Sequence, residues 1–285
     1  MLGWFKRKKK EDPKAQLAAS LGDFTLPNFP AVANRVLGLL RDPDVPLDAA
    51  GDALAEDPGL SAKVLGIANS SAFALRHPVR SVSHATSLLG RSTVESLLLG
   101  VVVQSSLPRP EITGFDQRRF WRTAARRAAA ARALADVLHP RTKSESFTAS
   151  LLEDMAVPLI GAAKGGDYGV VLEQWHHDGG DLAALERDAL GFDHAVVAGW
   201  VAQSWKLPEN LADAIGSHHD EEALEYDGPP PAVALVAPLG EGSDEQGFDE
   251  VVQVTHARFG VATDAVAHLL KEAFVAADEI AARMS

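Results

Sequence analysis

Residues 147–160 read FTASLLEDMAVPLI, an apolar segment with two adjacent acids, Glu153 and Asp154, in its middle. An ionised carboxylate without a partner in an apolar interior is strongly destabilising unless it takes up a proton. We therefore expect the two acids to bind a ligand, to pair with a cation, or to lie at the rim of the packed helices. Pro158 follows Asp154 by four residues, and we expect it to kink or end the helix that carries the acids.

Helices are expected on both sides of this stretch. Most apolar residues recur at helical rather than alternating spacing, and alanine is abundant, so we predict an all-α protein. In the N-terminal half, helices are expected within 26–42, from about 48 to 56, after Asp57-Pro58, from Ser81 to Leu89, and after the capping-box pattern STVE at 92–95. In the C-terminal half, a long helix is expected from Asp116 to about Leu138, and Asp181 and Asp193 are expected to begin two shorter ones.

The long helix from Asp116 carries arginines on the face opposite its apolar residues. They are Arg118, Arg119, Arg122, Arg126 and Arg127. A charged stripe of this kind is commonly a solvated helix face. The alternative is a surface that contacts a partner or an anionic ligand.

Turn-forming residues predict how the chain is divided. SLPRPEITG at 106–114 has two prolines and a glycine, and we place a boundary near residue 110. DGPPPA at 227–232 is expected to be a linker, and GEGSDEQG at 240–247 an exposed acidic loop. We predict a two-part helical bundle with a basic flexible tail at 1–19, an N-terminal helical subdomain at 20–110, a second helical subdomain at 111–225, and a C-terminal helical extension at 226–285 packed on the second subdomain.

Composition excludes several kinds of site. The chain has 285 residues, 46% hydrophobic and 23% charged, as in an ordinary globular protein. It has no cysteine, which excludes disulfides, zinc fingers and a cysteine nucleophile, and which fits a reducing cytoplasm. The net charge is −12 although KRKKK at 6–10 contributes +5, so the remainder carries −17. Such an acidic body would repel phosphates, and we expect no nucleic-acid binding.

The first ten residues combine aromatic and basic side chains. Trp4 and Phe5 precede Lys6, Arg7, Lys8, Lys9 and Lys10, and no apolar run of signal-peptide length follows. The simpler interpretation is a solvated tail, and the alternative is a weak tether to anionic lipid. The longest apolar run elsewhere, LLLGVVV at 97–103, is too short to span a bilayer. We expect a cytoplasmic protein that contacts the inner membrane, if at all, through residues 1–10.

Candidate metal ligands are spread over the C-terminal half. Glu153, Asp154, His194, His218 and His219 fall on successive predicted helices, and mixed histidine and carboxylate ligands from several helices are typical of a divalent-metal site. Each histidine taken alone is more commonly a hydrogen-bonded structural residue. No nucleophile elbow, phosphate-binding loop or dinucleotide fingerprint is present, so phosphates would have to be bound by arginines or a metal.

Residues 26–90, from LPNFP to SLLG, resemble the HDOD domain, the HD-related output domain of bacterial signalling proteins. The LP..P opening, the DP.LSA.VL..ANS block and the S...A...LG helix carry the resemblance. It continues through FWR at 120–122, LGFDHAVVAGWVAQSWKLP at 190–208 and the pair His218-His219, so it covers about residues 20–225. Residues of the motif expected to be structural are Pro27, Pro30, Asp57, Pro58, Leu60, Ser61, Asn69 and Gly90.

The resemblance implies a fold similar to the HD phosphohydrolases, whose metal site uses a histidine on one helix, an adjacent His-Asp pair on the next, and further His or Asp ligands. Here the pair is Glu153-Asp154, and Thr123 stands where the first histidine is expected. The glycine and lysine that often follow the pair are replaced by Ala156 and Val157. We therefore expect a degenerate site without metal or cofactor, in which arginine or histidine neighbours hold the two acids. The surviving ligand positions would be Asp154, His194, His218 and His219.

The family resemblance implies a non-catalytic output or adaptor module of signal transduction that acts through protein contacts. By the same analogy its partners would be sensor kinases, response regulators or cyclic di-GMP enzymes. One alternative is a metal-dependent phosphohydrolase that acts on a cyclic nucleotide or related phosphoester through Asp154 and the histidines. A second alternative is a nucleotide-binding sensor without turnover.

Overall fold

The computed structural model describes residues 26–28, 30–240 and 246–284, which form helices and no strand, so the all-α prediction is confirmed. The N-terminal half consists of α2 (Ala31–Arg41), α3 (Leu47–Ala55), α4 (Pro58–Ala68), η1 (Ser71–Phe73), α5 (Val82–Leu89) and α6 (Arg91–Ser106). The next part consists of α7 (Gln117–Leu138), η2 (Pro140–Thr142), α8 (Lys143–Leu152), α9 (Ala156–Lys164), α10 (Gly166–Asp178), α11 (Leu182–Leu190), α12 (His194–Ser204) and α13 (Glu209–Gly216). The last elements are η3 (Glu221–Glu225), α14 (Pro230–Val236), α15 (Phe248–Phe259) and α16 (Thr263–Met284).

The DP.LSA block builds the start of α4. The Asp57 carboxylate accepts a hydrogen bond from the Leu60 N–H at 3.0 Å, and Pro58 fills the first helical position, where a missing N–H costs nothing. The Ser61 hydroxyl donates to the Leu54 carbonyl at 2.8 Å and ties α4 to the end of α3. Asp57 thus caps α4, and Ser61 joins it to α3.

Two other motif residues shape loops. The Asn69 side chain accepts from the Val79 N–H at 2.7 Å and donates to the Val79 carbonyl at 2.9 Å, which fixes the connection between α4 and α5. Gly90 joins α5 to α6 with φ +86°, a backbone conformation that side chains rarely adopt. Pro27 contacts a residue far away in the sequence. Its carbonyl accepts a hydrogen bond from the indole N–H of Trp205, the C-cap residue of α12, at 2.9 Å.

The predicted capping box at 92–95 is wrong. α6 begins two residues earlier, at Arg91 with Gly90 at the N-cap position, and no side chain caps its first turn. The Ser92 hydroxyl donates instead to Glu145 at 2.7 Å, and Glu95 accepts from Arg41 at 2.6 Å. Both polar side chains have partners on other helices, and these tertiary contacts replace the local cap.

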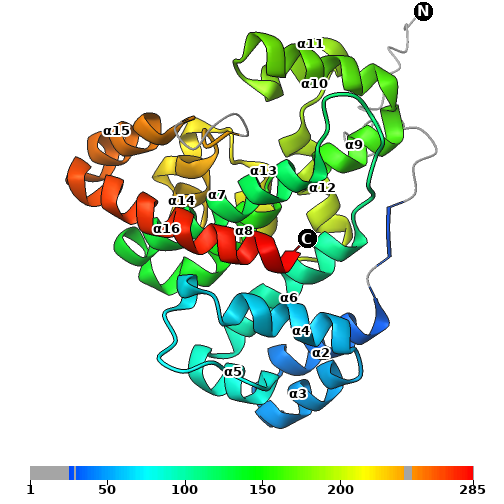
Figure 1. The fold of residues 1–285 in the computed structure, drawn as a ribbon, viewed down its shortest axis with the longest axis vertical. Helices are drawn as coiled ribbons and strands as arrows, with labels where there is room; N and C mark the ends of the chain where they lie inside the picture. The colour runs from blue at the N-terminus through cyan, green and yellow to red at the C-terminus, as the bar shows by residue number, and fades with distance from the viewer. Residues whose placement is uncertain (1–25, 29, 241–245, 285) are drawn as a thin grey trace, which may run out of the picture.

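α6 connects the N-terminal helices to the second part of the chain. It contacts α2, α4 and α5 on the N-terminal side and α8 on the other side, as Figure 1 shows. Its apolar side chains from 97 to 103 are at most 1% exposed. One cluster of buried apolar residues extends through both halves, and the predicted boundary near residue 110 falls between α6 and α7. The division into subdomains stays a prediction.

α16 lies along α7 and also contacts α4 and η1, so the C-terminal extension packs on both halves (Figure 1). This packing corrects the predicted arginine surface. Arg126 and Arg127 are each 7% exposed, because α16 and the segment after α14 cover that part of α7. The Arg126 guanidinium lies 5.2 Å from the centre of the Phe274 ring of α16. Arg118, Arg119 and Arg122 are exposed, and their role as an interaction surface stays a prediction.

The proline string at 227–232 is a helix start and not a linker. Pro230 begins α14, and Pro230, Pro231 and Ala232 are buried. Prolines are tolerated in a first helical turn because the N–H groups there have no partner within the helix. Residues 241–245 of the predicted acidic loop, the predicted tail at 1–19 and the aromatic and basic residues 4–10 lie outside the described residues. Within the described ranges, no helix has both the length and the apolar character needed to cross a bilayer.

Candidate functional site

The acid pair lies at a break between two helices. α8 ends at Leu152 and α9 begins at Ala156, so Glu153 and Asp154 occupy a turn. Pro158 has no N–H to donate to the carbonyl of Asp154, and its ring would crowd that carbonyl in a continuous helix. The expected break is therefore present, but it precedes Pro158, which stands in the first turn of α9.

Arg127 of α7 contacts both acids. Its Nη1 lies 3.1 Å from Glu153 Oε1 and forms a closer ion pair with Asp154 Oδ2, while its Nε donates to the Leu239 carbonyl at 2.7 Å. The Glu153 side chain is 1% exposed. Burial raises the pKa of Glu153 to about 8 against the opposing effect of the Arg127 charge. Burial therefore favours the neutral form of Glu153, and the arginine charge is matched mainly by Asp154.

Two histidines approach the other oxygen of Asp154, and a third contacts one of them. His194 begins α12, and His218 and His219 follow the end of α13. Asp154 Oδ1 lies 3.2 Å from His194 Nε2 and 3.4 Å from His218 Nε2. His194 Nε2 lies 3.3 Å from His218 Nε2 and 2.9 Å from His219 Nε2. The neighbours of Asp154 are thus an arginine and histidines, the residue types that the sequence led us to expect.

The rings of His194 and His218 are each held in place by a hydrogen bond at Nδ1, the nitrogen farther from Asp154. The Glu186 carboxylate accepts from both Nδ1 and the backbone N–H of His194, each at 2.6 Å, and also from the Tyr168 hydroxyl. The Ile215 carbonyl lies 2.7 Å from His218 Nδ1. Carboxylate and carbonyl oxygens can only accept, so both Nδ1 atoms carry protons. The Nε2 atoms of His194 and His218 are then the ones that face the cluster.

The charges at the site depend on one another. Burial would raise the pKa of Asp154, but the Arg127 charge and the hydrogen bonds from His194 and His218 outweigh it and hold that pKa well below its usual range. Burial would lower the pKa of His194, but the carboxylates of Glu186 and Asp154 outweigh it and raise that pKa well above its usual range. An ionised Asp154 therefore faces a protonated His194 when these residues have only each other as partners.

The same atoms also fit a divalent cation. Tetrahedral zinc ligands at 2.0–2.1 Å from the ion are about 3.4 Å apart, and the four separations given above run from 2.9 to 3.4 Å. The ligand atoms of His194, His218 and His219 lie within 4.8 Å of one another. Burial, together with the charges of His218 and His194, lowers the pKa of His219 to about 2. Its neutral ring can accept a hydrogen bond from the His194 Nε2–H or donate a lone pair to a metal.

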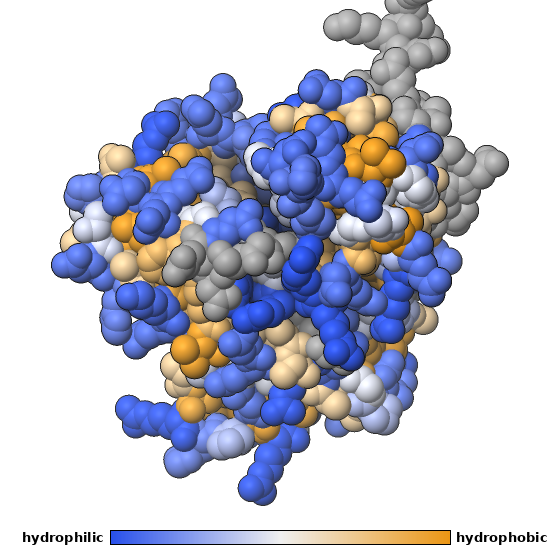
Figure 2. Space-filling model, turned by 45° about the horizontal axis from the view of Figure 1, so that its top comes forward, coloured by the Kyte–Doolittle hydropathy of each residue, from blue (hydrophilic) through white to orange (hydrophobic). Residues whose placement is uncertain are grey.

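A pocket of about 640 Å³ lies in front of this cluster. Its walls contain Arg127, Asp154 and the three histidines, residues of the α10–α11 turn, and residues of α14 and α15. Figure 2 shows the surface hollowed between the part formed by α10 and α11 and the part formed by α15. Glu153 is not among the described residues that line it, so only Asp154 of the acid pair faces the pocket.

The structure thus brings together four of the five predicted site residues, Asp154, His194, His218 and His219, and places Glu153 behind them. Sequence reasoning placed Arg127 only in the arginine stripe and did not predict that it contacts the acid pair. A signal was available, because Arg127 lies one helical turn after Thr123 and so on the face where the first ligand is expected. Glu186 and Tyr168 were also missed, and their positions in the sequence resemble those of ordinary helix residues.

Comparison with known families finds a match over about two thirds of the chain. A family model described as the HDOD domain matches residues 26–221. An uncharacterized protein of Treponema pallidum (strain Nichols) is 23% identical over 208 residues, which are 72% of this chain and 40% of that protein. The chain therefore spans less than half the length of this curated relative.

Solved structures share the fold over almost the whole chain. A candidate phosphohydrolase from Shewanella amazonensis SB2B is 25% identical with a TM-score of 0.74, covering 95% of this chain and 98% of that one. An HDOD domain protein of unknown function from Geobacter sulfurreducens is 22% identical with a TM-score of 0.70, covering 94% and 96%. A candidate signal transduction protein from Marinobacter aquaeolei VT8 is 23% identical with a TM-score of 0.71, covering 96% and 66%.

Proposed function

This chain belongs to the HDOD domain family, and from that premise we propose that it is a non-catalytic output or adaptor module of signal transduction. It works in the cytoplasm through contacts with signalling proteins, for which sensor kinases, response regulators and cyclic di-GMP enzymes are the partners to test. Its HD-like pocket is a degenerate metal site.

The observation that carries the proposal is the contact of Arg127 with both acids. A guanidinium paired with Asp154 supplies the positive charge that a metal would supply to that carboxylate, and it repels a divalent cation placed nearby. Glu153 adds no second anionic ligand at the pocket, because burial favours its neutral form and it is not among the lining residues. Thr123, where the first histidine is expected, offers no imidazole. These three features support a pocket with low metal affinity.

The test is metal content and turnover of the purified protein after dialysis against Zn²⁺, Mn²⁺ or Mg²⁺. We expect substoichiometric metal and no hydrolysis of cyclic dinucleotides above the level of the Asp154→Asn variant. Stoichiometric metal together with turnover that Asp154→Asn abolishes would overturn the proposal. Titration calorimetry with the same dinucleotides tests the third possibility, a sensor that binds without turnover.

A metal-dependent phosphohydrolase is the second candidate, and the convergence of the Asp154 and histidine atoms favours it. Asp154, His194, His218 and His219 would hold the cation, which when bound supplies Lewis-acid activation of a water molecule and of a phosphoryl oxygen. Glu186 would keep the His194 ring in place. Arg258, which also lines the pocket, would contact phosphate oxygens.

The Arg127→Gln variant distinguishes the two candidates, because it removes the guanidinium and keeps the four candidate ligands. Under the first proposal, the variant binds divalent metal more tightly than the wild type and has no turnover. Under the second, the wild type already binds stoichiometric metal and has turnover. Dye-competition titration with Zn²⁺ gives the affinity independently of any assay of activity.

A further inference from the structure

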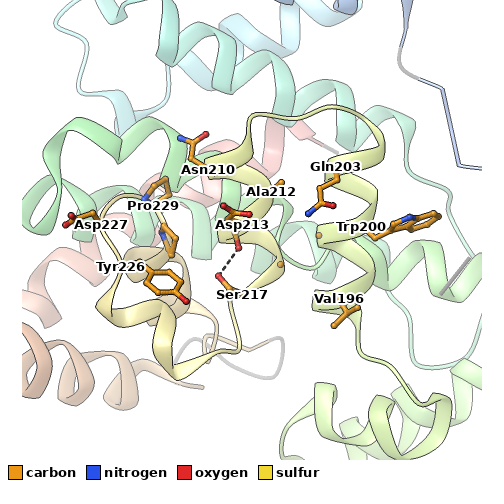
Figure 3. A pocket seen from close by; sticks show the side chains of 13 residues that line it. Val196, Trp200, Gln203, Asn210, Ala212, Asp213, Ser217, Tyr226, Asp227 and Pro229 are labelled. Carbon is orange, nitrogen blue, oxygen red and sulfur yellow. Dashed lines mark hydrogen bonds between the residues drawn. The ribbon is translucent and has the colours of Figure 1, made fainter. Parts of the chain in front are cut away.

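A second groove, of about 670 Å³, lies over α13 between α12 and the segment that joins η3 to α14. Figure 3 shows Val196, Trp200 and Gln203 of α12 on one side and Tyr226, Asp227 and Pro229 on the other. Asp213 and Ser217, from α13 and its C-terminal end, lie between them. This groove is separate from the histidine cluster, because none of the residues that face the cluster is among its lining residues.

Apolar side chains of the groove are unusually exposed. Val196 is 53% exposed and Tyr226 is 51% exposed, and they stand on its two sides. Trp200, on the same side as Val196, is partly exposed. Large apolar side chains gathered around a concave surface indicate a site that another chain segment covers. The occupant should therefore bring apolar or aromatic side chains of its own.

The groove is also acidic. Among the described residues that line it there is no lysine or arginine, and Asp213 and Asp227 face it without a paired cation in the described part of the chain. Both of these aspartates are exposed, so two carboxylates and no basic side chain stand at the groove. The occupant should therefore be basic as well as aromatic.

A segment with both properties belongs to this chain. The indole N–H of Trp205 donates to the Pro27 carbonyl, so the chain enters the described region beside the end of α12, the helix that forms one side of the groove. Residues 4–10 read WFKRKKK, two aromatic residues followed by five positive charges. Sixteen peptide steps separate Lys10 from Leu26, enough for about 50 Å of extended chain.

We propose that residues 4–10 dock in this groove, with Trp4 and Phe5 against its apolar side chains and the basic run against its carboxylates. Because the segment is tethered, its effective concentration at the groove is in the millimolar range, so individually weak ion pairs suffice for substantial occupancy. Docking of this kind removes the basic run from contact with anionic lipid. It also weakens as ionic strength rises, because exposed charges are screened.

The absence of cysteine from the chain allows a direct test by crosslinking. The reporter variant carries Lys8→Cys together with Val196→Cys in the groove. The matched control carries Lys8→Cys together with Val275→Cys on α16, where the valine side chain is 67% exposed. Both are treated with a short bismaleimide, and the rate of crosslinking within one chain is followed by gel mobility and peptide mass. We expect the groove pair to react at least about tenfold faster than the control pair.

The charge dependence provides the second readout. Adding Asp213→Lys and Asp227→Lys to the reporter variant should lower the crosslinking rate to that of the control pair, with unchanged circular dichroism. Equal rates for the groove and control pairs would overturn the proposal. Crosslinks found only between chains would assign the groove to a second copy and also overturn it. Binding to phosphatidylserine vesicles that is identical with and without the two aspartate changes would assign the basic run to lipid instead.

Discussion

Glu153 makes the stability of the folded protein depend on pH. Burial raises its pKa from 4.5 to about 8, so the folded protein keeps a proton there that the unfolded chain releases above its own, lower pKa. The folded state therefore binds more protons between these two values, and the free energy of unfolding falls as pH rises through this window. The stabilisation is fully present below the unfolded pKa and is lost as Glu153 ionises near pH 8.

We expect Glu153→Gln to flatten this slope between pH 5 and 8, because glutamine keeps the shape of the neutral acid and has no proton to lose. Urea unfolding in the presence of a chelator at several pH values measures the slope. Glu56→Gln, at an exposed acid, is the control and should leave the slope as it is in the wild type. A slope in Glu153→Gln as steep as in the wild type would show that Glu153 does not cause the dependence.

Arg127→Gln should destabilise the protein by about 3–5 kcal/mol, the usual cost of leaving a buried charge without its partner. The charge left behind is that of Asp154, with Glu153 beside it. Adding Asp154→Asn should recover part of this loss, because no ionised acid then remains to be compensated. A double-mutant cycle in urea measures the coupling, and a coupling near zero would contradict the central role of this ion pair.

At the scale of elements, the crossing of α12 and α13 holds the histidines together. A methyl group on Gly199 would lie 3.0 Å from the Gly216 Cα, so Gly199→Ala must push the two helices apart. We expect a cost of about 1–3 kcal/mol and altered NMR signals of His194 and His218, which lie at the ends of these helices. Gly38→Ala in α2 is the matched control, since nothing lies within 4 Å of the added carbon. It should stabilise by about 0.4–1 kcal/mol.

Helix starts could be predicted because their signals are local. Asp57, Asp116, Asp181 and Asp193 each accept a hydrogen bond from a backbone N–H in the first turn of the following helix. The capping box at 92–95 failed because its side chains have partners on distant helices. Local patterns are reliable only where no tertiary contact competes for the same polar groups.

The site could be predicted only in part. The convergence of Asp154 and the histidines followed from the family resemblance, since the spacing in the sequence does not bring their helices together. The burial of Arg126 and Arg127 could not be predicted, because they continue a stripe that begins with exposed arginines, and the elements that cover them come far later in the chain. A helix pattern shows which residues share a face, but not what packs on it.

At the scale of the whole molecule, α16 joins the two halves, and Ile280 on this helix is fully buried. We expect Ile280→Ala to cost about 2–5 kcal/mol and to speed hydrogen exchange in both α4 and α7. Val275→Ala, at an exposed position of the same helix, should change stability by less than about 0.5 kcal/mol. Faster exchange in α7 alone would show that α16 does not couple the halves.

The packing of α16 on the N-terminal half should affect the rates of folding and unfolding. The N–H and hydroxyl of Ser71 donate to the Glu279 carboxylate at 2.8 and 3.1 Å, across 208 positions of sequence. Contacts between residues so far apart form slowly, because a long loop must close before they contribute. The last turns of α16 should therefore dock late in folding. Substitutions that weaken the contacts of these last turns should raise the unfolding rate and leave the folding rate almost unchanged. The contacts of α16 then determine the lifetime of the native state.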